Sequence, residues 1–487
     1  MSPTQDHAEF DLVVVGAGAV GENVADRAVQ GGLSVAIVES ALIGGECSYW
    51  ACMPSKALLR AGIALRAGQG VDGARQAISG ELDVSAVLRH RDAVASHWND
   101  DGQAKWVDNA GITLLRGHAR LTGTRTIAVT GDEGHTLTYT ARHAVALCTG
   151  SVALLPDIPG LADAEPWTSK DATSAQQVPG RLAILGGGVV GAEMATAYAT
   201  FGTEVTVITR GGLLGGNEPF AGELVGDALG KLGATVRGGV QIESVRRLDD
   251  GTVRLTLDDG TTLETDELLV ATGRAPQTHD LGLASVGLED GEWLPVDDTL
   301  RVLDGAGTPV DGGWLYAVGD VNHRVLLTHQ GKYQARAAGD VIAARAYGRP
   351  VHDRPWGAHV ATADHTAVPQ VIFTDPQVAA VGVTAAEAEK AGCRTRVVDY
   401  DIGSVAGASV HREDYTGKAR MIVDEDREVI VGATFVGPDV AELLQAATVA
   451  VVGEVPISRL WHAVPPYPTI SEIWLRLLET YGRPGAR

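Results

Sequence analysis

Two of the four cysteines lie close together, and their spacing suggests redox chemistry. Four residues separate Cys47 from Cys52, and the segment continues Met-Pro-Ser-Lys. Pro54 is typical of the first turn of a helix, which puts Cys52 at or near a helix N-terminus. The helix dipole stabilises a thiolate there and lowers its pKa, so Cys52 is suited to relay electrons. A structural crosslink is the weaker interpretation, because so short a loop restrains the unfolded chain little.

The remaining composition narrows the class of protein. Cys148 and Cys393 have no partner nearby in the sequence, and we expect both to be buried, unreactive thiols. Four cysteines in 487 residues are too few for a disulfide scaffold and favour a reducing, cytoplasmic location. The net charge of −22 argues against nucleic acid or an anionic membrane as a partner. We expect no signal peptide in residues 1–10 and no membrane span, which needs roughly 18–20 apolar residues.

A glycine-rich turn near the start of the chain predicts a nucleotide site. Gly16, Gly18 and Gly21 follow an apolar run and precede an Ala-rich helical stretch, and the next apolar run ends at Glu39. Such a turn aims backbone N–H groups and a helix dipole at a pyrophosphate. A carboxylate at the end of the second strand accepts hydrogen bonds from a free ribose hydroxyl. Glu39 therefore predicts an adenosine without a 2′-phosphate, as in FAD or NAD.

The same pattern recurs in the middle of the chain with a different strand end. Gly186, Gly188 and Gly191 again follow an apolar run, and the position equivalent to Glu39 holds Thr209, followed by Arg210. Without a carboxylate to repel it, and with a guanidinium beside it, a 2′-phosphate would be accepted here. We therefore expect NADPH rather than NADH at this turn. Two copies in register are far more specific than one.

Taken together, these motifs resemble the class I pyridine nucleotide–disulfide oxidoreductases, the family of dihydrolipoamide dehydrogenase, glutathione reductase and mercuric ion reductase. The resemblance runs from about Phe10 to Tyr481 and depends mainly on the Cys-x4-Cys-x-Pro-Ser-Lys segment between two dinucleotide motifs. It implies an enzyme with FAD and NAD(P)H that passes electrons through a disulfide formed by Cys47 and Cys52. A homodimer with a small-molecule disulfide, thiol-adduct or quinone substrate is implied as well.

The resemblance also assigns roles to single residues. Cys47 would face the substrate as interchange thiol, and Cys52 would lie against the flavin. Lys56 and Glu193 would pair near flavin N5, and Asp320 would hydrogen-bond the ribityl chain. No metal ligands are expected. The cofactor-binding residues that we expect are Gly16, Gly18, Gly21, Glu39, Lys56, Thr149, Gly150, Gly186, Gly188, Gly191, Thr209, Arg210, Gly273, Arg274, Gly319 and Asp320.

The length of 487 residues requires several domains. We expect an α/β protein with two Rossmann-like dinucleotide-binding domains, for FAD and NAD(P)H, and a C-terminal α+β dimerisation domain. Residues 347–355 would be the linker into that last domain. In chain order, we expect the first part of the FAD-binding domain at residues 1–155 and the NAD(P)H-binding domain at residues 156–274. The second part of the FAD-binding domain would follow at residues 275–350, and the interface domain at residues 355–487.

One part of the pattern departs from the disulfide reductases. Their C-terminal His-Pro-Thr-x-x-Glu segment supplies an acid–base histidine, whereas Tyr467 occupies that position here and Glu472 remains. A phenol titrates near 10 and is a poor base at neutral pH, unlike imidazole. His462 is a possible substitute. Mercuric ion reductase also carries Pro-Tyr there, but it has a terminal cysteine pair that residues 483–487 lack.

The missing histidine restricts the electron acceptor. An alkyl thiolate needs a proton to leave, whereas leaving groups of lower pKa need it less. We therefore expect a thiol-bound metal, a disulfide of acidic thiols, or a quinone, rather than glutathione disulfide or lipoamide. Three alternatives stay open at this point: a relay through the cysteine pair, a quinone or metal reductase (mercuric reductase-like) that bypasses it, and dihydrolipoamide dehydrogenase. A non-catalytic FAD-binding subunit would need neither cysteine.

Overall fold

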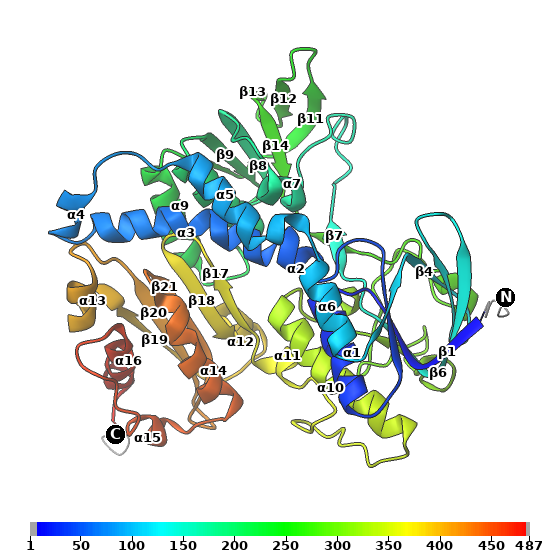
Figure 1. Ribbon diagram of the computed structural model, residues 1–487. Helices are drawn as coiled ribbons and strands as arrows, with labels where there is room; N and C mark the ends of the chain where they lie inside the picture. Colours follow the sequence, from blue (N-terminus) through cyan, green and yellow to red (C-terminus); the bar gives the residue numbers. More distant parts are fainter. Residues whose placement is uncertain (1–6, 484–487) are drawn as a thin grey trace. The chain divides into compact units, whose positions relative to one another are not determined.

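The structure is a computed structural model that describes residues 7–483 and divides the chain into two compact units (Figure 1). Unit 1 combines the chain up to Met53 with residues 92–152 and 274–365. Unit 2 combines residues 54–91 and 153–273 with the chain from Thr366 onward. None of the helices in residues 7–483 is both long and apolar enough to cross a membrane.

Unit 1 is built on one mixed sheet with the strand order β3-β2-β1-β6-β5-β4, and β16 pairs with β6. The strands β1, β2, β3 and β16 run parallel to their neighbours, and β4, β5 and β6 form an antiparallel meander. Residues 12–15 of β1, residues 35–38 of β2 and all of β16 are apolar and buried, as is typical of parallel strands that are covered on both faces. The strands are β1 (His7–Val15), β2 (Val35–Glu39), β3 (Thr113–Arg116), β4 (His118–Gly123), β5 (Thr126–Thr130), β6 (Thr136–Leu147) and β16 (Leu315–Ala317).

Two Ala-rich helices, α1 (Ala19–Gln30) and α10 (Thr328–Ala346), pack side by side in unit 1 (Figure 1). Small residues make this close approach possible. A Cβ atom on Gly31 would lie 2.4 Å from that of Ala343, and one on Gly339 would lie 2.5 Å from that of Arg27. The other helices of this unit include α2 (Gly45–Tyr49) and α6 (Asp101–Asn109).

Unit 2 contains a parallel four-stranded sheet with the order β10-β9-β8-β14, and a small antiparallel sheet of β11, β12 and β13. The first sheet carries α8 (Val189–Thr200) and α9 (Pro219–Lys231). Its strands are β8 (Arg181–Leu185), β9 (Glu204–Thr209), β10 (Thr235–Gly238) and β14 (Glu267–Val270). The small sheet has strands β11 (Ile242–Arg247), β12 (Val253–Leu257) and β13 (Thr262–Thr265).

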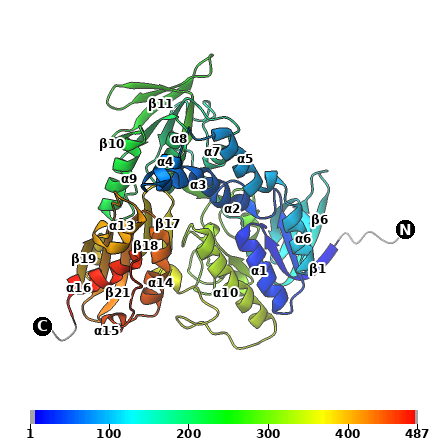
Figure 2. The same ribbon diagram turned by 60° about the vertical axis from the view of Figure 1, so that its left-hand side comes forward.

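The C-terminal part of unit 2 is an antiparallel sheet with the order β17-β18-β21-β20-β19. Helices α14 (Leu444–Val452) and α16 (Ile473–Tyr481) contact it (Figure 2). Apolar residues of α16 recur at helical spacing and are buried, which explains why this segment forms an amphipathic helix. The strands are β17 (Pro369–Ile372), β18 (Gln377–Gly382), β19 (Thr395–Asp401), β20 (Lys418–Asp424) and β21 (Val429–Gly437).

Candidate active site

The cysteine pair lies where a short helix is followed by a long one. Cys47 is in α2, and α3 (Cys52–Gln69) begins at Cys52, so the expected position at a helix start is confirmed. Both residues are present as thiols and are half-buried. Their side chains are hydrogen-bonded to each other. The Sγ atom of Cys52 also lies 3.3 Å from the Oγ1 atom of Thr328, the first residue of α10.

The environment of Cys47 affects the pKa of its thiol in two opposing ways. The hydrogen bond with Cys52, together with burial, raises the pKa of the Cys47 thiol above its ordinary value. The Lys332 ammonium, four residues after Thr328 on α10, lowers the pKa of Cys47 and opposes part of that effect. Neither Thr328 nor Lys332 was expected from the sequence, because nothing in their local pattern points to the distant cysteines.

The other two cysteines have different environments. Cys148 is buried, and burial raises the pKa of its thiol, which confirms the expected unreactive thiol. For Cys393 this expectation was wrong, because its side chain is exposed. Cys393 comes directly after Gly392, where the chain leaves α12 (Ala385–Lys390), and such connections run over the protein surface.

The first glycine-rich turn has a backbone that fits a dinucleotide. Gly16 has a φ of +98°, and a Cβ atom there would lie 2.5 Å from the carbonyl oxygen of Cys148. A Cβ atom on Gly21 would lie 1.8 Å from the carbonyl oxygen of Gly16. Gly18, in contrast, has an extended backbone, and a Cβ atom there would have its nearest neighbour, the Cα atom of Gly45, at 3.9 Å. The protein alone does not require a glycine at position 18, whereas a pyrophosphate approaching the helix start does.

The strand end beside this turn carries Glu39, as expected. Its carboxylate accepts hydrogen bonds from the backbone N–H groups of Ala17, at 2.7 Å, and Ala41, at 2.8 Å. The carboxylate is thereby fixed at the turn, with oxygen lone pairs left for ribose hydroxyls.

A polar network in unit 1 connects several of the expected flavin-site residues. Ser151 Oγ donates to Asp320 Oδ2 at 2.6 Å and accepts from Arg274 Nε at 2.5 Å. Arg274 also donates to Glu46, the residue before the first cysteine, at 2.6 Å. The Oγ1 atom of Thr149 is buried and has no hydrogen-bond partner in residues 7–483, as expected of a group that faces a polar ligand. Gly150, Gly273 and Gly319 all adopt a positive φ.

The second glycine-rich turn, in unit 2, repeats the first. A Cβ atom on Gly186 would lie 2.3 Å from the carbonyl oxygen of Ala271, one on Gly191 would lie 2.0 Å from that of Gly186, and one on Gly188 would meet nothing within 4 Å. Thr209 ends β9 and is buried, while the next residue, Arg210, is exposed. Among the described residues, Arg210 has no ion-pair partner.

The predicted pair of Lys56 and Glu193 is present in unit 2. Lys56 Nζ lies 2.8 Å from Glu193 Oε2, and the glutamate side chain is only 4% exposed. The other oxygen of Glu193 accepts the backbone N–H of Phe373 at 2.9 Å. The Lys56 ammonium also lies 4.9 Å from the centre of the Phe373 ring, a distance that permits a cation–π interaction. No sequence motif pointed to Phe373, whose backbone N–H fixes the carboxylate that holds the lysine.

In the C-terminal segment, Tyr467 and Glu472 lie in different surroundings. The tyrosine side chain is 76% exposed, whereas that of Glu472 is buried. One oxygen of Glu472 accepts from Arg476 Nη2 at 2.7 Å, and the other has no hydrogen-bond partner in residues 7–483. The side chain of His462 is exposed. Within the chain, Glu472 therefore orients neither Tyr467 nor His462 as a base.

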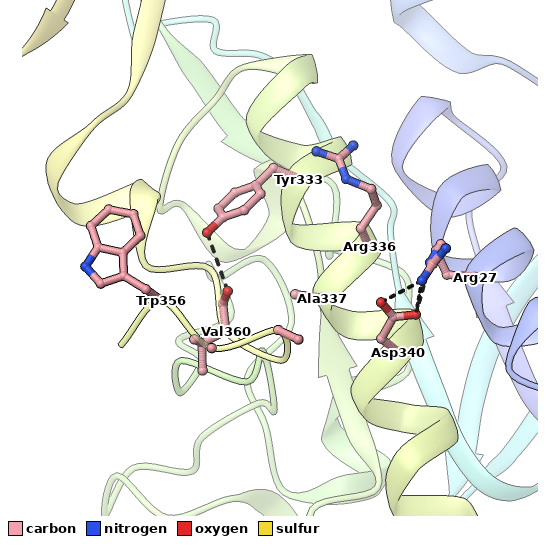
Figure 3. A pocket seen from close by; sticks show the side chains of 9 residues that line it. Arg27, Tyr333, Arg336, Ala337, Asp340, Trp356 and Val360 are labelled. Carbon is pink, nitrogen blue, oxygen red and sulfur yellow. Dashed lines mark hydrogen bonds and ion pairs between the residues drawn. The ribbon is translucent and has the colours of Figure 1, made fainter. Parts of the chain in front are cut away.

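A surface cavity of about 390 Å³ in unit 1 lies between α10 and the loop before β17 (Figure 3). Its side chains include Tyr333, Arg336 and Trp356, and the ion pair of Arg27 with Asp340 closes one end. None of the site residues expected from the sequence lines this cavity. Residues 7–483 also contain no cluster of His, Cys, Asp and Glu suited to a metal ion.

Comparison with known proteins identifies the family. The family model for pyridine nucleotide-disulphide oxidoreductases matches residues 10–340, and the model for their dimerisation domain matches residues 368–477. The chain belongs to this family. It is 32% identical to a mercuric reductase of Acidithiobacillus ferrooxidans over 99% of this chain and 84% of that protein. It is equally 32% identical to a dihydrolipoyl dehydrogenase of Haloferax volcanii, over 96% of this chain and 95% of that protein.

A solved structure supports the fold. The Cu(II) complex of the HOCl-induced flavoprotein disulfide reductase RclA from Escherichia coli superimposes with a TM-score of 0.80. It is 23% identical in sequence and covers 97% of this chain and 99% of its own. The expected α/β fold with Rossmann-like dinucleotide-binding regions and a C-terminal dimerisation domain is confirmed. The protein is an FAD-dependent oxidoreductase with NAD(P)H as electron donor.

Proposed function

We propose that this enzyme takes electrons from NADPH and passes them, through the pair of Cys47 and Cys52, to a disulfide or thiol adduct with an acidic leaving group. Bound FAD would supply the two-electron transfer between nicotinamide and disulfide, held by the first glycine turn, Glu39 and the Asp320 network. Support for the relay comes from the hydrogen bond between the thiols of Cys47, in α2, and Cys52, at the start of α3. The proposed domain assignment follows the motifs: residues 1–155 and 275–350 for FAD, 156–274 for NADPH, and 355–487 for a homodimer interface.

The preference for NADPH is supported by Arg210. Its guanidinium is exposed beside the second glycine turn and has no carboxylate partner among the described residues. A guanidinium without a partner is available for a phosphate, with which it forms strong charge-assisted hydrogen bonds. Thr209 adds no negative charge where a carboxylate would repel the 2′-phosphate.

The observation that carries the proposal about the acceptor is the arrangement of the C-terminal segment. A phenol is a poor base at neutral pH, and Glu472 is paired with Arg476 instead of orienting an imidazole. A leaving thiolate of low pKa departs without a proton, which removes the need for that base. Turnover of lipoamide or glutathione disulfide at the rates of specialised reductases would contradict this proposal.

An anaerobic titration with NADPH, followed by a panel of disulfides, metal–thiol adducts and quinones, tests the relay. We expect the reduced wild-type enzyme to show a thiolate-to-flavin absorption band. In Cys47→Ser this band should be changed, and the turnover of disulfides should be lost. Cys393→Ser is the matched control, because that thiol is exposed and lies outside the cysteine pair. Tyr467→Phe separates a role of the phenol hydroxyl from packing. If Cys47→Ser reduced all acceptors as fast as the wild type, the relay would be dispensable.

The second candidate function is reduction of a thiol-bound metal ion. Two observations favour it: the tyrosine in the C-terminal segment, and relatives named mercuric reductase, including one of Streptomyces lividans that is 31% identical over 98% of this chain. The same acceptor panel separates this function from reduction of a disulfide, because it predicts that metal–thiol adducts are turned over faster than every disulfide.

A further inference from the structure

The surface cavity of unit 1 has no role in the proposed function, although its volume suits a small molecule. It measures about 390 Å³, within the range of roughly 300–1,000 Å³ that is usual for ligand pockets. Helix α10 lines it with Tyr333, Arg336 and Ala337, and the loop that follows α10 lines it with Trp356 and Val360. In Figure 3 the two aromatic rings lie toward the left and the arginines toward the right. All of these residues belong to unit 1.

One cation of this cavity, Arg336, is not used by the fold. Its side chain is exposed, and its guanidinium forms no hydrogen bond or ion pair with any described residue (Figure 3). The second cation, Arg27, differs because it is paired with Asp340 at 2.7 Å. The three charged side chains of the cavity therefore leave one positive charge unbalanced, on a chain whose net charge is −22. Such a guanidinium is suited to bind a carboxylate through two parallel hydrogen bonds.

The indole of the cavity, Trp356, is held open to solvent on a strained backbone. Trp356 is 51% exposed, and its φ of +65° is unfavourable for a bulky residue. Its backbone N–H donates to Thr362 Oγ1 at 2.8 Å. The N–H of Gly357 donates to the carbonyl oxygen of Arg354, also at 2.8 Å, and the two hydrogen bonds fix the conformation. A half-exposed indole gains little from packing, so the strain points to a function such as stacking on a ligand.

The loop that carries Trp356 is also braced from within. The backbone N–H of His352 donates to Nδ1 of His359 at 2.8 Å, and the N–H of His359 donates to the carbonyl oxygen of His352 at 3.1 Å. His359 is buried. A Cβ atom on Gly357 would lie 2.3 Å from that same carbonyl oxygen, so only glycine fits this turn. The indole is thus presented by a preorganised loop, which lowers the entropic cost of binding a ligand.

We propose that this cavity binds a planar aromatic monocarboxylate, with its ring against Trp356 and its carboxylate on the guanidinium of Arg336. The ring follows from the exposed indole, on which flat π-systems stack. The single negative charge follows from the local balance. One unbalanced cation neutralises one carboxylate, whereas a phosphate dianion would leave a net negative charge beside Asp340. The cavity contains neither cysteine of the pair and no residue of either glycine-rich turn, so this inference goes beyond the proposed function.

Isothermal titration calorimetry with 2-naphthoate at pH 8 tests the site on the FAD-loaded enzyme, with saturating NADP⁺ present to occupy the second nucleotide site. We expect one molecule to bind per chain with a Kd below about 1 mM, as is reasonable for a ligand of this size. Two analogues with the same rings, the neutral 2-naphthamide and the dianionic 2-naphthyl phosphate, should each bind roughly tenfold more weakly. No binding of 2-naphthoate, equal binding of the amide, or tighter binding of the phosphate would overturn the proposal.

Two substitutions locate the binding site. Arg336→Ala should weaken the binding of 2-naphthoate about tenfold, because a charge-assisted contact is lost, and Trp356→Asn should weaken it about fivefold, because the stacking surface is lost. Asparagine tolerates a positive φ better than tryptophan does, so the loop should keep its shape. Arg349→Ala is the matched control. Arg349 is also exposed and lies 4.8 Å from the ring centre of Tyr347, but it is outside the cavity.

Unchanged binding in Arg336→Ala, or an equal loss in Arg349→Ala, would overturn the proposal. Should Trp356→Asn not fold, Arg336→Ala decides, because an exposed side chain without a partner can be removed without harm to the fold. The calorimetry measures binding alone, so its result does not depend on which acceptor the enzyme reduces.

Discussion

The two glycine-rich turns share one backbone design but differ in chemistry at the neighbouring strand end. In each turn the first and third glycines are required by the protein itself, since a Cβ atom would lie within 2.5 Å of a carbonyl oxygen. At the second glycine of each turn, a Cβ atom would meet no atom closer than 3.9 Å. At the strand end, however, Glu39 holds a carboxylate against backbone amides, whereas Thr209 and Arg210 supply a hydroxyl and a guanidinium without an ion-pair partner.

This difference separates two kinds of constraint. Backbone sterics fix the shape of the turn and are the same wherever a helix must start close to a strand. The identity of the nucleotide depends instead on the chemistry of the strand-end side chains. A change in the turn should therefore abolish binding, while a change at the strand end should have a smaller effect on affinity or on preference.

The largest effect is expected from valine at the second glycine of each turn. Both positions are extended, so valine fits the backbone, and the chain should fold. Gly18→Val should be purified without flavin, because the side chain fills the space of the pyrophosphate. Gly188→Val should keep its flavin, but NADPH should reduce that flavin at least roughly 100-fold more slowly than in the wild type. Flavin absorbance per chain and circular dichroism measure the two outcomes. A yellow Gly18→Val protein would show that this turn does not hold the flavin.

An intermediate effect is expected at the strand end of the second turn. Arg210→Ala should lower kcat/KM for NADPH by about 10- to 100-fold, because a hydrogen bond to a charged group is lost, and should leave NADH unaffected. Steady-state kinetics with both nucleotides measure this. Arg237→Ala is the control, since Arg237 lies in the neighbouring strand β10 and is already paired with Asp259 at 2.6 Å. Equal losses with NADPH and NADH would mean that Arg210 does not select the phosphate.

Local spacing rules were enough to predict the two turns and the position of Cys52 at a helix start. The pair of Lys56 and Glu193, 137 residues apart, was accessible only through the resemblance to a family. Thr328 and Phe373 escaped prediction for the same physical reason. Thr328 reaches Cys52 from 276 residues away, and Phe373 reaches Glu193 from 180 residues away through a backbone N–H. Nearly every residue type has a backbone N–H, so a hydrogen bond donated by one cannot be predicted from the identity of the residue.

Exposure and pairing were harder to predict than secondary structure. The thiol of Cys393 was expected to be buried because free cysteines usually are, yet the end of α12 leaves it at the surface. At Glu472, one carboxylate oxygen accepts a hydrogen bond from Arg476 four residues further along, a contact that the C-terminal motif did not indicate. A partner four residues along a helix competes well with a distant one, because the helix already holds it in place.

The smallest effect is expected at the strand end of the first turn. In Glu39→Gln one carboxylate oxygen becomes an amide that cannot accept the N–H of Ala17 or Ala41, so one hydrogen bond at the turn is lost. The loss of about 1 kcal/mol should weaken FAD binding roughly fivefold, measured by the recovery of flavin fluorescence on dilution. Glu39→Asp keeps the charge but shortens its reach, so it tests whether charge or geometry matters. If Glu39→Gln bound FAD as tightly as the wild type, the strand-end residue would not explain why the first turn favours a nucleotide without a 2′-phosphate. The contrast between Glu39 and Arg210 would then depend on the second turn alone.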